Sequence, residues 1–557
     1  MRPFGYLLFL LLCTACQPPA EDTATATSAE AAHLGAVQLA VTGNATAQPH
    51  FQEGLLLLHS FEFEDARTAF LQAQAADSLM VMAYWGEAMT HNHPLWRQQD
   101  PEAGRAVLAK LAPTPAERQT LAATPLEKAF LGTVEILYQE AGTKQERDQA
   151  YANAMAELRA QYPDQQEVAA FYALALLGAV PLGRDEAASE QSARIAQGII
   201  AENPQHPGAL HYLIHAYDDP AHAAQALSAA NSYAKVAPAA AHALHMPSHI
   251  YVSMGMWPEV ISSNIASWDA SVQRMERQGL DDNARSYHAL HWLTYGLTQQ
   301  GRFAEAEQLM QDFKTYTQNE PDRGARSYMV AMLANYRVET DDWDNPVLSS
   351  LAAERADLNI LSQATYQFME GWQAWRNNDA PQLAQVIKAM EKARKNATYQ
   401  VSDTGTPMCS AAGSSRSLPN QLDIDQAHVL ALELQALQAQ LAKKPAETER
   451  LLKAATELEA QLDYSYGPPR IALPAYELYG RWLLEQDRPA EAAQQFAYSL
   501  AKGPGRLAAL HGAWQAAVAT GQTTRADELA EQLMNQLRLA DIAAKNKFLP
   551  TSLLSAR

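Results

Sequence analysis

Residues 476–504 read YELYGRWLLEQDRPAEAAQQFAYSLAKGP, and the spacing of their side chains predicts the architecture of the chain. In the first half, large residues three and four apart surround Gly480; in the second half, Ala492 precedes Phe496 by four positions. Apolar residues at this spacing form one face of a helix. We therefore expect two helices joined by a turn, with small residues allowing close approach and Phe496 filling the space between them.

This pattern resembles the tetratricopeptide repeat (TPR), a helix–turn–helix unit. It recurs near the start of the chain, at Gly54 and Phe70, and the resemblance covers most of residues 47–540. Stacked helix pairs share one continuous core, because no pair can bury its apolar face alone. The sequence thus predicts an all-α protein, a right-handed α-solenoid of TPR-like helix–turn–helix repeats, and shows no strand-like alternation. The resemblance implies that the first helix of each pair lines a concave groove.

Composition divides the chain into five segments. The repeats are preceded by a Thr/Ala-rich polar stretch and interrupted by a Gly/Ser/Pro-rich loop, both typical of irregular structure. The segments are a lipoprotein signal peptide with a lipobox cysteine (1–16), a flexible tether (17–47), an N-terminal TPR-like solenoid with a His-rich groove (48–395), a polar loop insertion (396–420) and C-terminal TPR-like repeats (421–557).

The N-terminus resembles a bacterial lipoprotein signal. Its apolar core, Tyr6–Leu12, is too short to span a bilayer and ends in LCTAC. The resemblance implies cleavage before Cys16 and lipidation of that cysteine, and Gln17 after it implies a bacterial cell-envelope protein anchored in the outer membrane and facing the periplasm. An ordinary secretory signal cleaved nearby is the alternative. Cys409 would then be the sole unmodified cysteine of the mature chain, so we expect no intramolecular disulfide.

The charge balance excludes one class of partner. The 557 residues carry a net charge of −20 at pH 7, which repels the phosphates of nucleic acid and anionic lipid headgroups. We therefore expect no nucleic-acid partner, and membrane contact through the lipid anchor only.

Seven of the 16 histidines fall at matching positions of three neighbouring repeats. They occupy the second, fifth and ninth positions of frames that begin at 207, 241 and 287. This i, i+3, i+7 spacing places them on one face of the helix. The TPR resemblance implies that this face points toward the groove. The predicted site consists of His211, His215, His242, His245, His249, His288 and His291.

Metal binding is the sharpest interpretation of this face. Packed helix axes lie about 8–10 Å apart, close enough for imidazoles of adjacent helices to meet at one ion. Imidazole suits Zn, Cu and Fe, so a transition metal is the predicted cofactor. Asp218 follows His215 closely, whereas Asp219-Pro220 is typical of a helix start. The secondary candidates are His91, His93 and Tyr295.

The sequence leaves three functions open. The first is a lipid-anchored periplasmic TPR protein that binds a protein, peptide or small-molecule ligand, with a transition metal as the specific hypothesis. The second is a metal-dependent enzyme that uses the cluster with an open coordination site. The third is a metal-free protein–protein interaction scaffold. A scaffold predicts an open groove with dispersed histidines, and an enzyme predicts imidazoles that converge in a closed pocket.

The segment HALHMPSHIY, residues 242–251, surrounds Pro247 with three of these histidines. A proline inside a helix removes a hydrogen bond and clashes with the preceding turn. We therefore expect the helix to begin near Pro247 or to bend there, turning His245 and His249 toward the neighbouring repeats.

Overall fold

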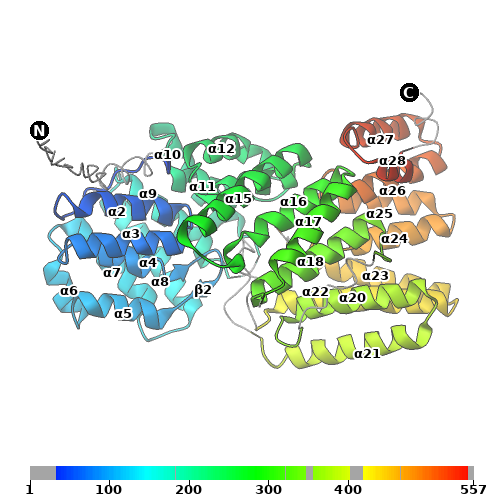
Figure 1. Cartoon of the computed structure of the whole chain (residues 1–557), viewed down its shortest axis with the longest axis horizontal. Helices are drawn as coiled ribbons and strands as arrows, with labels where there is room; N and C mark the ends of the chain where they lie inside the picture. The colour runs from blue at the N-terminus through cyan, green and yellow to red at the C-terminus, as the bar shows by residue number, and fades with distance from the viewer. Residues whose placement is uncertain are drawn as a thin grey trace, which may run out of the picture.

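The structure is a computed structural model, and it describes residues 33–181, 183–319, 321–345, 355–401, 418–463 and 466–549. The chain forms an elongated stack of helices, with the N-terminal helices at one end and the C-terminal helices at the other (Figure 1). Several sequence predictions lie outside the described residues: the signal peptide 1–16 with Cys16, tether residues 17–32, and loop residues 402–417 with Cys409.

Helices that are neighbours in sequence pack against each other as pairs joined by short turns. The helices of the first half are α2 (Ala47–His59), α3 (Phe63–Ala76), α4 (Val81–Met89), α5 (Pro101–Leu111), α6 (Pro115–Leu121), α7 (Pro125–Tyr138), α8 (Lys144–Gln161), α9 (Gln166–Ala179), α10 (Glu186–Glu202), α11 (Pro207–Ala216), α12 (Ala223–Val236), α13 (Ala241–His245), α14 (Pro247–Ser253) and α15 (Trp257–Gln278).

The second half continues the same arrangement after a short 3-10 turn, η1 (Asp282–Ala284). Its helices are α16 (Tyr287–Gln299), α17 (Phe303–Tyr316), α18 (Arg323–Thr340), α20 (Ile360–Arg376), α21 (Ala380–Ala397), α22 (Gln421–Leu441), α23 (Pro445–Gln461), α24 (Ala475–Glu485), α25 (Pro489–Lys502), α26 (Leu507–Ala519), α27 (Thr523–Gln536) and α28 (Ile542–Phe548).

The small–large packing expected of a TPR-like repeat is present at both ends of the stack. Phe496 is fully buried against Gly480, where an added Cβ would meet the phenyl ring at 2.8 Å. Phe70 is also fully buried and packs on Gly54 at the same 2.8 Å. The prediction of an all-α solenoid of TPR-like helix–turn–helix repeats is confirmed.

One short element departs from the all-helical prediction. The strands β1 (Asn92–His93) and β2 (Gln98–Gln99) pair antiparallel as a hairpin between α4 and α5. Two-residue strands carry too little alternation to be visible in the sequence.

The segment 33–46, predicted as part of a flexible tether, is packed on the repeats. The side chains of Leu34 and Val37 are 3% and 6% exposed, and the Ala36 N–H donates to the Gln205 carbonyl at 2.9 Å. The tether prediction is therefore corrected for these residues, because apolar side chains within the polar stretch find a buried surface.

The two halves are tied together by contacts between repeats that are distant in sequence. The indole N–H of Trp257 in the middle of the chain donates to the Gly505 carbonyl at 3.0 Å, and the Asp541 N–H donates to the Gly301 carbonyl at 2.9 Å. The C-terminal helices α26–α28 thus lie beside α16 and α17 (Figure 1). Among the described helices, none is both long enough and apolar enough to cross a bilayer.

Candidate metal centre

The break that Pro247 imposes sets the direction of two imidazoles. Helix α13 ends at His245, and α14 begins at Pro247, where a missing N–H costs nothing in the first turn. The Nε2 atoms of His245 and His249 then lie 3.2 Å apart. The Nε2 atom of His288, from the neighbouring repeat, lies 2.9 Å from that of His245. These three buried residues form one group, triad B.

The hydrogen bonds around triad B determine where its protons lie. The Nδ1 atom of His245 lies 2.7 Å from Oδ1 of Asn264, whose Nδ2 donates to the Val260 carbonyl, so Nδ1–H must be the donor. His249 Nδ1 lies 2.5 Å from the carboxylate of Asp218 and is also a donor. In the neutral rings, both Nε2 atoms therefore carry a lone pair.

Three more histidines form triad A, which consists of His211, His215 and His242. The Nδ1–H of His211 donates to the His59 carbonyl at 2.8 Å, which leaves a lone pair on Nε2. That nitrogen lies 3.1 Å from Nε2 of His215. The Nδ1 atom of His215 and the Nε2 atom of His242 are buried and have no hydrogen-bond partner among the described residues.

The two triads lie side by side. The ring centroids of His215 and His249 are 5.8 Å apart, and those of His242 and His245 are 6.2 Å apart. The stripe on the predicted helix is thus divided, since His242 belongs to triad A while His245 and His249 belong to triad B.

Aromatic residues close the site from two directions. The Phe61 ring lies 4.3 Å from that of His211, and the Trp292 ring lies 4.6 Å from that of His249. Trp96 approaches His242 edge-on at 6.0 Å. The open groove that the scaffold hypothesis predicts is not found at these residues: the triad histidines are buried, except His242, which is half-buried. The imidazoles converge in a closed interior.

Burial keeps these imidazoles neutral. Desolvation lowers the pKa of His211 to about 3, although the hydrogen bond to the His59 carbonyl opposes the shift. Desolvation also lowers the pKa of other triad histidines well below the usual value, and neighbouring imidazoles add to the effect. These histidines are His215, His242, His245 and His288. The neutral imidazole is the form that binds metal.

Three other predicted histidines lie outside both triads. Nε2 of His291 lies 2.8 Å from Oδ1 of Asn335. The His93 ring stacks on Phe63 at 3.9 Å, and its Nε2 lies 2.9 Å from a backbone carbonyl. His91 is half-buried in the turn after α4. None of the three belongs to a metal-ligand group among the described residues.

Tyr295, predicted at the edge of the site, belongs to a different polar cluster. Its hydroxyl accepts a hydrogen bond from Arg506 at 2.9 Å. The Arg506 guanidinium also forms ion pairs with Glu477 and, at 2.7 Å, with Glu339. All three charged groups are buried.

A third buried group has a different proton arrangement. The Nδ1 atom of His206 accepts the Ala209 N–H at 3.2 Å, so the neutral ring carries its proton on Nε2, which faces Glu167 at 3.1 Å. Nε2 of His59 lies 2.6 Å from the other Glu167 oxygen, and Tyr212 lies 2.8 Å from Nδ1. Although burial opposes it, His206 and His59 lower the pKa of Glu167. Nε2 of His206 and the Glu167 oxygen that faces it lie in contact without forming a hydrogen bond. The three residues are also close enough together to hold a metal ion, but a carboxylate takes the place that a third imidazole has in each triad.

Sequence spacing did not reveal the residues that orient and cover the triads. Asn264 and Tyr328 contact the Nδ1 atoms of triad B, the latter at 3.0 Å from His288, but they lie on other helices and have no histidine-like periodicity. The closeness of Asp218 to His215 in sequence was the only such signal.

The chain matches no family model and no curated protein. Solved structures are similar at low identity. The structure of Ypp1 is 9% identical, with 89% of this chain and 88% of that chain covered and a TM-score of 0.38. Yeast Tom70 is 11% identical, with 88% and 99% covered and a TM-score of 0.27. The TPR domain of P58(IPK) is 12% identical, with 86% and 99% covered and a TM-score of 0.17. At such scores these similarities carry no functional argument.

Proposed function

We propose that this protein binds transition-metal ions in triads A and B. The observation that carries the proposal is the pair of Nε2 atoms of His245 and His249, 3.2 Å apart, whose Nδ1 protons are donated to Asn264 and Asp218. Neither Nε2 atom can then donate to the other, and two facing lone pairs at this distance repel. A cation bound between the two nitrogens would be coordinated by both lone pairs and would remove the repulsion.

The spacing of the nitrogens fits a shared metal ion. Two nitrogens bound tetrahedrally about 2.0–2.1 Å from one zinc ion lie about 3.3–3.4 Å apart. The separations in triad B, 2.9 and 3.2 Å, and the 3.1 Å between His211 and His215 are close to this value. In addition, a carboxylate behind a ligating histidine, as Asp218 lies behind His249, is the usual support of a metal ligand.

The ligand types of the triads narrow the choice of metal ion. Each triad consists of imidazoles only, which suits Zn and Cu, whereas non-haem Fe sites usually include a carboxylate ligand. We therefore favour Zn or Cu and keep Fe as the third candidate. Three protein ligands leave a coordination position open, which is typical of catalytic rather than structural sites.

That open position favours a metal-dependent enzyme as the second candidate function. A metal held there would polarise a substrate oxygen or activate a bound water. Within the chain, the described residues bury and orient the imidazoles, and the rings of Phe61 and Trp292 restrict solvent. A metal-free scaffold gains no support from the histidines, because buried imidazoles offer a partner no surface. Protein binding elsewhere on the helical stack remains part of the proposal.

Metal content tests the proposal. We expect the full chain, purified from the envelope of its own host, to contain close to two metal ions, one for each triad. The double variants His211→Ala/His215→Ala and His245→Ala/His249→Ala should each lose one ion while keeping their helical circular dichroism. Less than one ion in the wild type, or metal that survives both double substitutions, would overturn the assignment.

The envelope location is a separate part of the proposal, supported by the LCTAC sequence alone. Cys16→Ser is expected to move the protein from the outer-membrane fraction to the soluble fraction and to abolish incorporation of labelled fatty acid. A Cys13→Ser variant is the matched control and should remain in the membrane fraction.

A further inference from the structure

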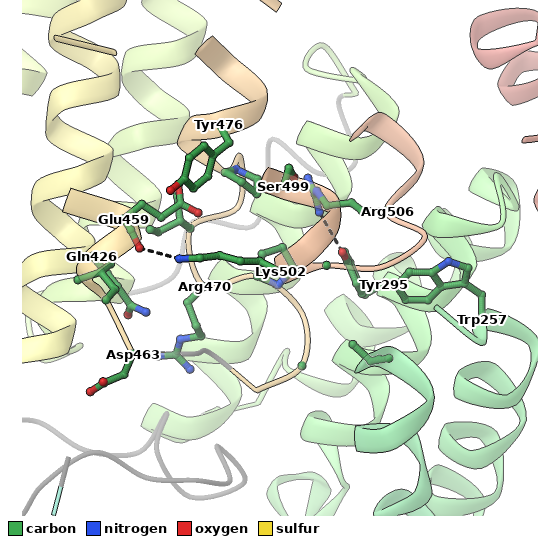
Figure 2. Close-up of a pocket in the computed structure, with 17 residues that line it drawn as sticks. Trp257, Tyr295, Gln426, Glu459, Asp463, Arg470, Tyr476, Ser499, Lys502 and Arg506 are labelled. Carbon is green, nitrogen blue, oxygen red and sulfur yellow. Dashed lines mark hydrogen bonds between the residues drawn. The ribbon is translucent and has the colours of Figure 1, made fainter. Parts of the chain in front are cut away.

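A cavity with a volume of about 110 Å³ lies outside both triads (Figure 2). Residues from several parts of the chain line it: Val252 and Trp257 where α14 meets α15, Tyr295 of α16, Gln426 of α22, residues within 459–463 and 467–476, and residues within 499–506 at the turn between α25 and α26. Val252, Trp257, Leu462 and Ile471 supply apolar walls, and Tyr476 closes one side. The cavity has the mixed apolar and polar lining of a small-molecule site.

One of the cations around this cavity is already neutralised. Arg506 is buried and forms ion pairs with Glu339 and Glu477, and it also donates to the hydroxyl of Tyr295, as Figure 2 shows. Its charge and donors are therefore committed within the protein, so Arg506 forms a fixed wall.

Two other cations at the cavity have no carboxylate partner. Arg470 makes no hydrogen bond or ion pair with any described residue, although it is only partly exposed. Lys502 donates to the backbone carbonyl of Glu459 at 2.8 Å and forms no ion pair within the described part of the chain, although its charge lowers the pKa of the Glu459 carboxyl, which lines the same cavity. Asp463 lines the rim without an ion pair to Arg470. A half-buried guanidinium beside an apolar wall is a typical carboxylate-binding arrangement.

We propose that this cavity binds a small organic anion, with its carboxylate held by Arg470 and Lys502 and its apolar body packed against Trp257 and Ile471. The volume of about 110 Å³ admits only a small ligand. The proposal goes beyond metal binding and does not depend on it.

Arg470 lies near triad B, so a ligand bound by Arg470 would lie near that triad as well. Arg470 also lines a smaller cavity of about 30 Å³, together with His291, Trp292 and Tyr328. Trp292 packs on His249, and Tyr328 contacts His288. An anion held by Arg470 would therefore be separated from triad B by these aromatic residues.

Binding of phenylacetate to the full chain, followed by isothermal calorimetry, tests the proposal. We expect phenylacetate to bind and its neutral isostere phenylacetamide to bind at least about tenfold more weakly, because a charge-assisted hydrogen bond contributes roughly a factor of 10 to 100. Arg470→Gln should weaken phenylacetate binding by a similar factor, and Lys502→Gln should weaken it independently. Arg525→Gln is the matched control, because it removes an exposed arginine on α27.

Equal binding of acid and amide, or an unchanged affinity in Arg470→Gln, would overturn the proposal. So would the absence of binding for phenylacetate, benzoate and hexanoate alike at millimolar concentration. The same titration on chelator-treated protein separates this site from the triads: we expect the affinity to be retained, so a failure of metal binding would leave the anion site standing.

Discussion

Replacing Asp218 by asparagine tests the metal centre with a change of one atom. The Asp218 carboxylate accepts the Nδ1 proton of His249 at 2.5 Å, and both side chains are buried. Asparagine can still accept this proton, so the ring keeps its direction, but the hydrogen bond loses its charge assistance and about half of its strength. His249 then becomes a weaker electron donor at Nε2.

The expected effect is confined to triad B. Mutation of the partner behind a ligating histidine lowers metal affinity about 10- to 100-fold, equivalent to about 1.4–2.7 kcal/mol. Triad A should keep its affinity, because His211 is oriented by the His59 carbonyl instead. If the two triads bind zinc with similar affinity in the wild type, their titration steps coincide. In Asp218→Asn we therefore expect two separate steps, one with the wild-type affinity and one with a lower affinity.

Competition with a chromophoric chelator measures both steps on metal-free protein titrated with Zn²⁺. Asp219→Asn is the matched control: it removes the same charge one residue away, where the carboxylate accepts hydrogen bonds from Ala221 and His222 and contacts no triad. Unchanged affinity in Asp218→Asn would refute the reasoning, and so would an equal loss in the Asp219 variant.

Three further predictions concern stability in urea denaturation. Arg506→Met leaves two buried carboxylates without their cation and should cost about 3–5 kcal/mol, whereas Arg525→Met, at an exposed pair, should cost less than about 1 kcal/mol; equal losses would contradict the buried network. Gly467→Ala places a Cβ against the Trp292 ring at a φ of 94°. It should lower the free energy of unfolding by at least about 1 kcal/mol more than Gly279→Ala, where φ is 65° and nothing lies within 4 Å. Equal losses in the two variants would show that the Trp292 ring moves aside. Burial raises the pKa of Glu459 to about 7, so the contribution of this residue to stability should fall by about 3 kcal/mol between pH 4.5 and 8. Glu459→Gln should therefore gain stability over the wild type at pH 8 but not at pH 5; the same difference at both pH values would exclude this titration.

The repeat could be predicted because its signal is local. Gly480 and Phe496 belong to one helix pair, so their contact is encoded by spacing within 34 residues of sequence, and the structure reproduces it. The histidine face was predicted on the same basis. The grouping of the histidines could not be: Pro247 splits one helix into two, and the ring directions depend on Asn264 and Asp218, which approach from other helices. Neither contact follows a regular spacing in the sequence from which it could have been predicted.

The direction of the hydrogen bonds, rather than the number of histidines, distinguishes a metal site from a buried network. The group of His59, Glu167 and His206 is as buried as the triads, but it contains a carboxylate that lies against both rings, 2.6 Å from Nε2 of His59 and 3.1 Å from Nε2 of His206. In triad B the Nδ1 protons of His245 and His249 point outward to fixed acceptors, and the Nε2 lone pairs point inward. Had burial alone gathered these histidines, the most stable arrangement would have placed a proton between neighbouring polar atoms, as between Nε2 of His59 and Glu167. Asn264 and Asp218 remove that option for the pair of His245 and His249, and a cation at the centre would bind both Nε2 lone pairs.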